Sequence, residues 1–472
     1  MELSAKTVSV TSPFPAHPYA RLAWREAGFW RDPAELAGAM DAAGLDGAAA
    51  LLSDGGPQGR WSYALARPDA VEAIDRGGLG DFARLRPLLG EAPPVVETPE
   101  DLPPFTGGVL GLASYDLGDG RHGDWPALTL ARYPALLAFD HHQGRILAVG
   151  RGSTDAKAAT RAESALARLD LRPAPLTPIT SAELEPEAPP AAYLAAVAAV
   201  IARIDRGDLY QANIARAWTA ILPDRPVALF RRLAAASPAP FAAWLDLGDR
   251  QLVSNSPELF LSLTAEGEIS ARPIKGTRPR RADAAADAAE AADLVASAKD
   301  RAENLMIVDL MRNDLARVAA PGSVTVPALF EVEPYANVHH LVSEVRAHLA
   351  PGRDVADLLA ATFPPGSITG APKRMAMSVI AGHEPPRGPW CGSLFLAGFD
   401  GSLSASVLIR TLAATRDGDV WRLRTQAGAG IVADSIPENE LAETEAKIAA
   451  IRRALSPYQS SSVTTSDTRG RR

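Results

Sequence analysis

Short stretches in which apolar and polar residues alternate occupy the first 170 residues, and this pattern is typical of strands with one buried face. Strands are predicted at 48–52, 61–66, 108–112, 135–139 and 145–149. Alanine-rich residues 156–169 predict a helix, and the proline-rich residues 171–190 that follow favour extended backbone. We interpret residues 171–190 as a connector, which either separates two domains or crosses a single fold.

The pattern becomes clearer after the connector. Apolar residues recur at helical spacing over 191–206, and Gly207 ends this predicted helix. Further strands are predicted at 210–219, 242–247, 252–255 and 259–263, and further helices at 283–315 and 437–455. The sequence therefore predicts an α/β (α+β) fold in which helices surround large, mainly antiparallel sheets. Its parts are an N-terminal α/β region at 1–170, the connector at 171–190, a C-terminal region at 191–458 and a disordered polar tail at 459–472.

Composition limits the partners and the location that fit the chain. It has 472 residues, of which 47% are hydrophobic and 22% charged, and a formal net charge of -8. Its longest basic cluster is 278–281, so we expect no nucleic-acid partner, because such a partner requires a broad basic surface. The single cysteine, Cys391, cannot form an internal disulfide, which suits a reducing cytosol. Without a signal-peptide pattern or an apolar run of about 18 residues, we expect a cytoplasmic protein that does not cross a membrane.

Two predicted helices carry pairs of carboxylates one turn apart. Asp300 and Glu303 share a face of one helix, and Glu440 and Glu443 lie beside the apolar stripe of the last helix. Salt bridges to neighbouring basic residues could satisfy the first pair, and the helix dipole could explain the acids that begin the last helix. Alternatively, two such pairs supply the oxygen ligands of a hard cation, and the scarcity of His and Cys favours Mg²⁺ over Zn²⁺.

Lys275 and Glu258 are candidates for catalysis. Lys275 lies between Ile274 and Gly276 in a strand-like turn, where it is either an exposed amine or, with its pKa lowered by a pocket, a nucleophile or base. Glu258 lies between a proline and a packed strand, and it is either a turn carboxylate or a general acid. The local sequence leaves both pairs of alternatives open.

Two glycine-containing loops and one arginine are candidates for binding an anion. The loop from Gly366 to Gly370 leads into a helix and exposes backbone N–H groups, although it lacks the Walker spacing. In AGAGIV, Gly428 and Gly430 allow the backbone to approach a ligand closely. Arg410 alternates with apolar residues in SVLIRTL, which predicts a position on a strand and a carboxylate partner from the protein or from a ligand.

Together these segments resemble the chorismate-binding enzyme family. The motifs PIKGTRPR, DRAENLMIVDLMRNDL, FPPGSITGAPK, WCGS and GAGIVADS occur in the order typical of that family. The resemblance covers residues 190–456 strongly, and the first 170 residues more weakly through GRWSYALARP and FTGGVLGLASYDLG. It implies a chorismate-binding catalytic region at 191–458 and an N-terminal region like that of anthranilate synthase component I.

The resemblance implies that chorismate is the substrate and that Mg²⁺ is the cofactor. Glu303 and Glu443 would hold Mg²⁺ against the ring carboxylate of chorismate, with Asp300 and Glu440 assisting. The same resemblance therefore assigns the two carboxylate pairs to one metal site.

The resemblance also implies the catalytic residues. Glu258 would protonate the departing 4-hydroxyl of chorismate while Lys275 adds at C2, and ammonia would then attack C4 and expel the lysine. His340 aligns with an active-site histidine of the family, although a packed strand histidine is the alternative. The implied substrate contacts are Arg410, Gly428, Gly430, Thr277, Thr369, Lys373, Trp390 and Gln211.

At three positions the residues resemble those of the family members that make aminodeoxychorismate. Anthranilate synthases typically have alanine where Lys275 stands. Members that add water have a lysine base where Gln211 stands, and a glutamine cannot deprotonate water. Trp390 stands where the members that form anthranilate or salicylate usually have tyrosine. The alternatives are an anthranilate synthase component I and, in a different class, a non-catalytic subunit that binds chorismate or tryptophan and regulates a partner.

The sequence also bears on the source of ammonia. Cys391 lies in PWCGS, which differs from the Gly-x-Cys-x-Gly motif of a glutaminase nucleophile. The resemblance therefore implies that a separate glutamine amidotransferase subunit supplies ammonia. It further implies a tryptophan pocket in the N-terminal region, near Ser53.

Overall fold

The computed structural model describes residues 6–8, 17–56, 59–90, 101–176, 179–180, 182–335 and 338–456. Within these ranges, every helix is too short or too polar to cross a lipid bilayer. The tail predicted at 459–472 lies outside the described residues.

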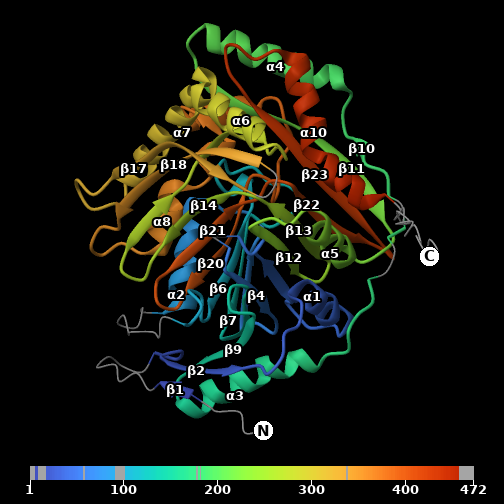
Figure 1. Ribbon diagram of the computed structural model, residues 1–472, viewed down its shortest axis with the longest axis vertical. Coiled ribbons are helices and arrows are strands. Elements are labelled where there is room, and N and C mark those ends of the chain that lie inside the picture. The colour runs from blue at the N-terminus through green and yellow to red at the C-terminus, as the bar shows by residue number, and fades with distance from the viewer. Residues whose placement is uncertain are drawn as a thin grey trace, which may run out of the picture.

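The described strands form two large sheets in which neighbouring strands pair antiparallel (Figure 1). The first sheet has, in spatial order, β1 (Lys6–Val8), β2 (Arg21–Glu26), β9 (Arg145–Gly152), β8 (Ala135–Asp140), β4 (Trp61–Leu65), β3 (Ala49–Leu52), β12 (Phe241–Asp246), β13 (Arg250–Ser256), β22 (Thr411–Asp417), β23 (Val420–Ile431), β11 (Gln211–Leu222) and β10 (Glu185–Pro186), and β19 (Gly370–Ala371) pairs with β11. The second has β16 (Ile274–Pro279), β18 (Val338–His348), β15 (Glu268–Ala271), β14 (Leu259–Leu263), β21 (Leu403–Val407), β20 (Ser393–Gly398), β6 (Gly108–Ala113), β7 (Leu128–Tyr133) and β5 (Ala70–Ile74), and β17 (Thr325–Pro334) pairs with β18.

Helices lie around these sheets, and many of them begin at a polar residue whose side chain accepts a backbone N–H. Asp32, Thr154, Asp283, Ser297 and Asp354 are such N-caps. The α-helices are α1 (Pro33–Ala42), α2 (Leu85–Leu89), α3 (Asp155–Leu166), α4 (Pro190–Asp205), α5 (Pro226–Ala236), α6 (Ala284–Ala296), α7 (Ala298–Ala316), α8 (Val355–Thr362), α9 (Lys373–Ala381) and α10 (Pro437–Leu455). Short 3₁₀ turns are η1 (Leu79–Arg84), η2 (Tyr115–Leu117), η3 (Ala167–Asp170) and η4 (Gly366–Ile368). In Figure 1, α3 lies beside β2 at the bottom and α10 lies near α4 at the top.

The hydrophobic core lies in layers. Between the sheets, Leu136 and Leu252 of the first sheet share a buried cluster with Leu110 and Leu396 of the second. A second cluster joins the outer face of the first sheet to α1, α5 and α10, and a third joins the second sheet to α7 and α8. Two sheets packed face to face and covered by helices confirm the predicted fold class.

Most predicted elements agree with the structure, and the clearest difference concerns one helix. The helix predicted over 283–315 is divided into α6 and α7 at Ser297, so the prediction of one continuous helix is wrong. The Ser297 hydroxyl accepts the N–H of Asp300 at 3.2 Å and starts a new helix there. This break sets the direction of α7, which carries Asp300 and Glu303.

Both sheets contain strands from both sides of the connector. In the first sheet, Leu52 of β3 lies opposite Ala242 of β12, and in the second, Ala113 of β6 lies opposite Ser393 of β20. Residues 171–190 include β10, which extends the first sheet by pairing with β11. The connector therefore crosses a fold whose sheets the two sequence regions share.

Candidate active site

Lys275 and Glu258 both contact the turn η4. Lys275 belongs to β16, and Glu258 lies just before β14. The Ser367 hydroxyl donates to Oε1 of Glu258 at 2.6 Å, and the Ser367 carbonyl accepts from Nζ of Lys275 at 3.4 Å. One residue of η4 thus links the two candidates for catalysis.

The surroundings favour the uncharged forms of both groups. Burial lowers the pKa of Lys275, and the nearby carboxylates of Glu303 and Glu258 oppose this shift. Burial raises the pKa of Glu258, and the Ser367 hydroxyl and Lys275 oppose that shift. A neutral amine is a nucleophile and a protonated carboxyl is a proton donor, so the site can hold a nucleophile beside an acid.

The four predicted metal ligands lie on α7 and α10. Burial raises the pKa of Glu303, with Asp300 and Glu440 adding to the shift, so the carboxylates of the two helices are close enough to repel one another. Burial, followed by Glu443, likewise raises the pKa of Glu440.

Some of these acids already have partners. Asp300 accepts from Arg278 at 3.2 Å, and Glu443 forms an ion pair with Lys447 at 2.6 Å. In the part of the chain that the structure describes, no three or more His, Cys, Asp or Glu side chains are arranged to hold a metal ion. The structure therefore brings the predicted acids together without forming a closed ligand set.

The two glycines of AGAGIV lie on β23 with their N–H groups on its open edge. They pair across from Ala215 and Asn213 of β11, whose own N–H groups donate away from β23. These are therefore the pairs of an antiparallel ladder that do not exchange hydrogen bonds, and the N–H groups of Gly428 and Gly430 point away from β11. Lys447 Nζ donates to the Gly428 carbonyl on that same edge at 2.8 Å. The edge beside α10 is thus available to an anionic group.

Arg410 does not lie on a strand, which corrects the prediction. It occupies the bend between β21 and β22 in the left-handed region, with φ of 51°. Its side chain is exposed, and among the described residues no hydrogen bond or ion pair satisfies its guanidinium. Of the two predicted carboxylate sources, protein and ligand, a protein partner is absent among the described residues, and the guanidinium is available to a carboxylate of a ligand.

His340 and Thr277 face each other across β16 and β18. Nδ1 of His340 lies 2.9 Å from the Thr277 hydroxyl. Burial and the charge of the nearby Arg410 lower the pKa of His340 to about 4, so the imidazole is neutral near pH 7. His340 can therefore exchange hydrogen bonds with a substrate but does not add a positive charge.

Gln211 is fully buried next to Gly430. A Cβ on Gly430 would come within 2.7 Å of the Gln211 amide nitrogen, and a Cβ on Gly428 would come within 2.5 Å of the Asn213 amide oxygen. The glycines thus make room for these amides. Among the described residues, neither polar atom of the Gln211 side chain has a hydrogen-bond partner. A buried amide without partners favours a polar ligand at this position.

Thr369 and Lys373, predicted as substrate contacts, instead hold the loop between α8 and α9. The Thr369 hydroxyl lies 3.2 Å from the carbonyls of both Pro365 and Gly366. The Lys373 ammonium donates to Asp314 at 2.5 Å, and to two further loop carbonyls, so its three protons are all used. Both side chains therefore have partners inside the protein, and their contact with a substrate stays a prediction.

Replacing Lys373 by methionine is expected to lower the free energy of unfolding by about 1–3 kcal/mol, because buried Asp314 keeps only its second cation, Arg317, and the carbonyls of Thr362 and Pro364 lose their donor. Denaturant unfolding measures this change. Lys299→Met removes the cation of a more exposed pair, whose ammonium lies 4.0 Å from Glu303, and should change stability by less than about 1 kcal/mol. Equal effects of the two substitutions would contradict the assigned role of Lys373.

Trp390 lies in a buried network beside Arg387. The Arg387 guanidinium lies between the rings of Trp390 and Tyr115, with its carbon 5.0 Å and 4.5 Å from the two ring centres, and it pairs with Glu384 at 2.8 Å. The observed position of Trp390 is thus explained by packing, and its contact with a substrate stays a prediction.

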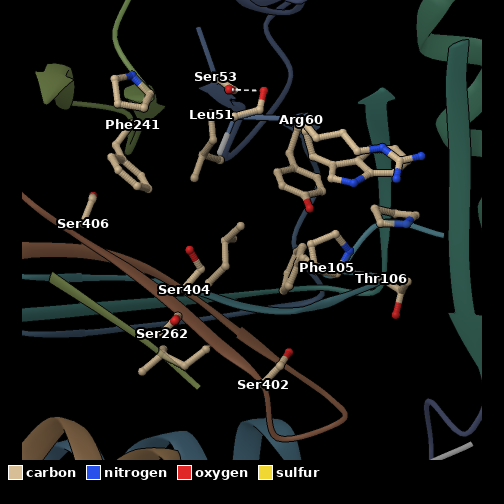
Figure 2. Close-up of a pocket in the computed structure, with 18 of the residues that line it drawn as sticks. Leu51, Ser53, Arg60, Phe105, Thr106, Phe241, Ser262, Ser402, Ser404 and Ser406 are labelled. Carbon is tan, nitrogen blue, oxygen red and sulfur yellow. Dashed lines mark hydrogen bonds between the residues drawn. The ribbon is translucent and has the colours of Figure 1, made fainter. Parts of the chain in front are cut away.

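A separate cavity of about 570 Å³ opens between the two sheets. Figure 2 shows Leu51 and Ser53 on one side of it and Ser262 and Ser404 on the other. The Ser53 residue named from the sequence therefore lines a real cavity. Its walls combine leucine and aromatic side chains with hydroxyl groups, which suits a mostly apolar ligand with a few polar atoms.

Sequence reasoning missed Ser367, Asn213 and the contacts of Lys447. The glycine-rich setting of Ser367 in PPGSITG was a usable signal, because such loops position polar groups near a ligand. Asn213 carried no local signal. Lys447 was recognised as a neighbour of Glu443 at helical spacing, but its bond to Gly428 joins residues from separate elements.

Comparisons with known proteins show the family to which the chain belongs. A buried lysine beside a buried acid, near a cluster of carboxylates, is typical of an enzyme site. The family model for chorismate binding enzymes matches residues 62–453, and the chain belongs to the chorismate-binding enzyme family.

Two curated relatives cover most of the chain. This chain is 42% identical to aminodeoxychorismate synthase component 1 of Salmonella typhimurium over 380 residues. The aligned residues make up 78% of this chain and 80% of that protein. The chain is 37% identical over 385 residues to anthranilate synthase component 1 of Thermus thermophilus, which covers 79% and 82%. Among solved structures, anthranilate synthase component I from Streptococcus pneumoniae superposes with a TM-score of 0.72 at 28% identity, over 84% of this chain and 92% of that one.

Proposed function

We propose that this chain is the chorismate-converting subunit of an aminodeoxychorismate synthase. It replaces the 4-hydroxyl of chorismate by an amino group, which supplies the precursor of 4-aminobenzoate for folate biosynthesis. The observation that carries this proposal is the placement of Lys275 and Glu258 on either side of Ser367, with burial favouring the neutral amine and the protonated acid. The 42% identity to the Salmonella typhimurium protein supports the choice of reaction.

The proposed reaction has two displacement steps. The Lys275 amine forms a bond to C2 of chorismate, the ring double bonds shift, and the C4–O bond breaks as Glu258 gives its proton to the hydroxide, releasing water. Ammonia then attacks C4, the double bonds shift back, and the bond between C2 and Lys275 breaks. The new ammonium at C4 returns a proton to Glu258, so both residues regain their starting forms.

The enolpyruvyl carboxylate would bind at the open edge of β23. The N–H groups of Gly428 and Gly430 point there, and Arg410 has a guanidinium without a protein partner among the described residues. Gln211 would face the incoming ammonia, because its amide is buried and can accept a hydrogen bond without removing a proton from water.

We propose Mg²⁺ as the cofactor. The acids of α7 and α10 fit a hard cation, because burial and mutual repulsion raise the pKa of Glu303 and Glu440, and a cation would relieve that repulsion. Glu303 and Glu443 would hold the ion, with Asp300 and Glu440 assisting, and Glu443 and Asp300 would then leave their present partners Lys447 and Arg278. The bound ion would supply positive charge for the ring carboxylate of chorismate.

A separate glutamine amidotransferase subunit is the proposed source of ammonia. The relatives are named as component 1, which implies a second component. We also propose that the cavity beside Ser53 takes tryptophan, whose indole and polar backbone groups match its apolar walls and hydroxyl groups.

An anthranilate synthase is the second candidate, supported by the Thermus thermophilus and Streptococcus pneumoniae relatives. Lys275 argues against it, because release of an aromatic product does not require the lysine adduct. The two candidates differ in the product that they form from the same substrates.

Product analysis tests the proposal. The purified chain is incubated with chorismate, Mg²⁺ and ammonium at mildly alkaline pH, with and without a chelator, and an aminodeoxychorismate lyase is then added before chromatography. We expect 4-aminobenzoate only after the lyase is added and little product with the chelator. Glutamine should replace ammonium only when the partner subunit is present. Anthranilate formed without the lyase would assign the chain to the second candidate.

A further inference from the structure

The turn η4 is held firmly in place by the residues around it. Gly366 packs against α7, where a Cβ on the glycine would come within 2.7 Å of the Leu310 side chain. Thr369 binds the carbonyls of Pro365 and Gly366, and Lys373 binds the carbonyl of Pro364. Ser367 is therefore presented from a fixed support, and its hydroxyl is not needed to hold the turn itself.

The Ser367 hydroxyl donates its hydrogen bond to Glu258. It lies 2.6 Å from Oε1 of Glu258, a distance typical of a hydroxyl donating to a carboxyl oxygen. The carbonyl of the same residue accepts a hydrogen bond from Nζ of Lys275 at 3.4 Å. The nucleophile and the acid are 17 residues apart in the sequence and more than 90 residues from Ser367, so their joint contact with one residue is a feature of the fold.

We infer that Ser367 is a positioning residue, which fixes the Glu258 carboxyl relative to Lys275 so that proton donation and amine attack occur in one geometry. This inference rests on the roles proposed for Glu258 and Lys275. In the proposed first step, the bond to C2 forms as the bond from C4 to oxygen breaks, so an acid turned away from the leaving oxygen would leave the amine in place but stop the reaction. Substrate binding would change little, because Ser367 is not assigned to any substrate group.

The test compares Ser367→Ala with Ser367→Thr, and follows the consumption of chorismate rather than one product. Ser367→Ala is expected to lower kcat by roughly 10²-fold, with KM within about threefold, because a displaced catalytic group costs rate more than binding. Ser367→Thr keeps a hydroxyl and should stay within about threefold of the parent kcat. Ser323→Ala removes another partly buried turn hydroxyl, which donates to Ala320 at 2.8 Å, and serves as the matched control.

A double substitution separates positioning from a general loss of structure. If Ser367 acts through Glu258, adding Ser367→Ala to Glu258→Gln should lower kcat by less than about twofold beyond Glu258→Gln alone. The inference would be overturned if the two substitutions multiplied their separate effects on kcat, or if Ser367→Ala left kcat unchanged. It would also be overturned if Ser367→Thr lowered kcat as much as Ser367→Ala does. Thermal unfolding of each variant identifies any that fail to fold, and for these the double comparison is repeated with Ser367→Cys.

The inference and the proposed function fail in different ways. Full activity of Glu258→Gln would remove the acid on which the positioning role depends, and the proposed mechanism would fail with it. Formation of anthranilate would overturn the proposed function, whereas the dependence of chorismate consumption on Ser367 would still be measured.

Discussion

Lys275→Met should lower kcat for conversion of chorismate by on the order of 10³-fold or more, because the side chain that attacks C2 loses its amine. Lys447 is a nearby lysine, and its ammonium is held by the Gly428 carbonyl and by Glu443. It therefore cannot take the place of Lys275. Methionine keeps the length of the side chain, so the fold should be preserved and thermal unfolding should change little.

Steady-state kinetics with ammonium as the nitrogen donor measure this effect. Lys157→Met is the matched control, because Lys157 is exposed on α3, a helix of the N-terminal region that packs on β2 and β9. Its kcat should equal that of the parent chain. Retained turnover in Lys275→Met, with the same product, would mean that ammonia attacks chorismate directly and that the lysine adduct is not formed.

Glu258→Gln is expected to lower kcat by roughly 10²–10⁴-fold, the range typical of losing a general acid. Hydroxide is a poor leaving group, and the amide of glutamine has no proton to give it. The substitution is conservative in structure, since the glutamine oxygen can still accept from the Ser367 hydroxyl. KM for chorismate should therefore change much less than kcat.

Single-turnover measurements separate this chemical step from product release. Glu268→Gln serves as the control, because Glu268 is an exposed carboxylate on β15 of the same sheet. If Glu258→Gln and Glu268→Gln show the same small effect, another group donates the proton. The acids of α7 and α10 would then be the next candidates for the proton donor.

The parts of the site that follow from local periodicity were predictable from the sequence. Helical spacing placed Asp300 beside Glu303 and Glu440 beside Glu443, and the structure confirms that each pair shares a helix. The positions of the strands followed from the alternation of apolar and polar residues, and the position of α10 followed from apolar residues at helical spacing. These features depend on neighbours within one or two turns of the chain, so the sequence contains the information that they require.

Contacts between distant segments were not predictable in the same way. Lys373 carries the same charge whether it faces a substrate or Asp314, and its bond to Asp314 depends on how the fold places the start of α9 beside the end of α7. The left-handed backbone at Arg410 likewise depends on how the chain passes from β21 in the second sheet to β22 in the first, and nothing in SVLIRTL signals it. The family resemblance supplied expected roles for such residues, but it did not supply their contacts.

The sharing of both sheets between the two ends of the chain has a consequence for synthesis on the ribosome. Strand β6 gains its neighbour β20 only after some 280 further residues have been made, and β3 waits for β12. Contacts that join such distant segments form slowly, because a long loop must close before any of them is gained. The nascent N-terminal half therefore emerges with unpaired strand edges and depends on the arrival of the C-terminal half, so the chain folds as one late cooperative unit.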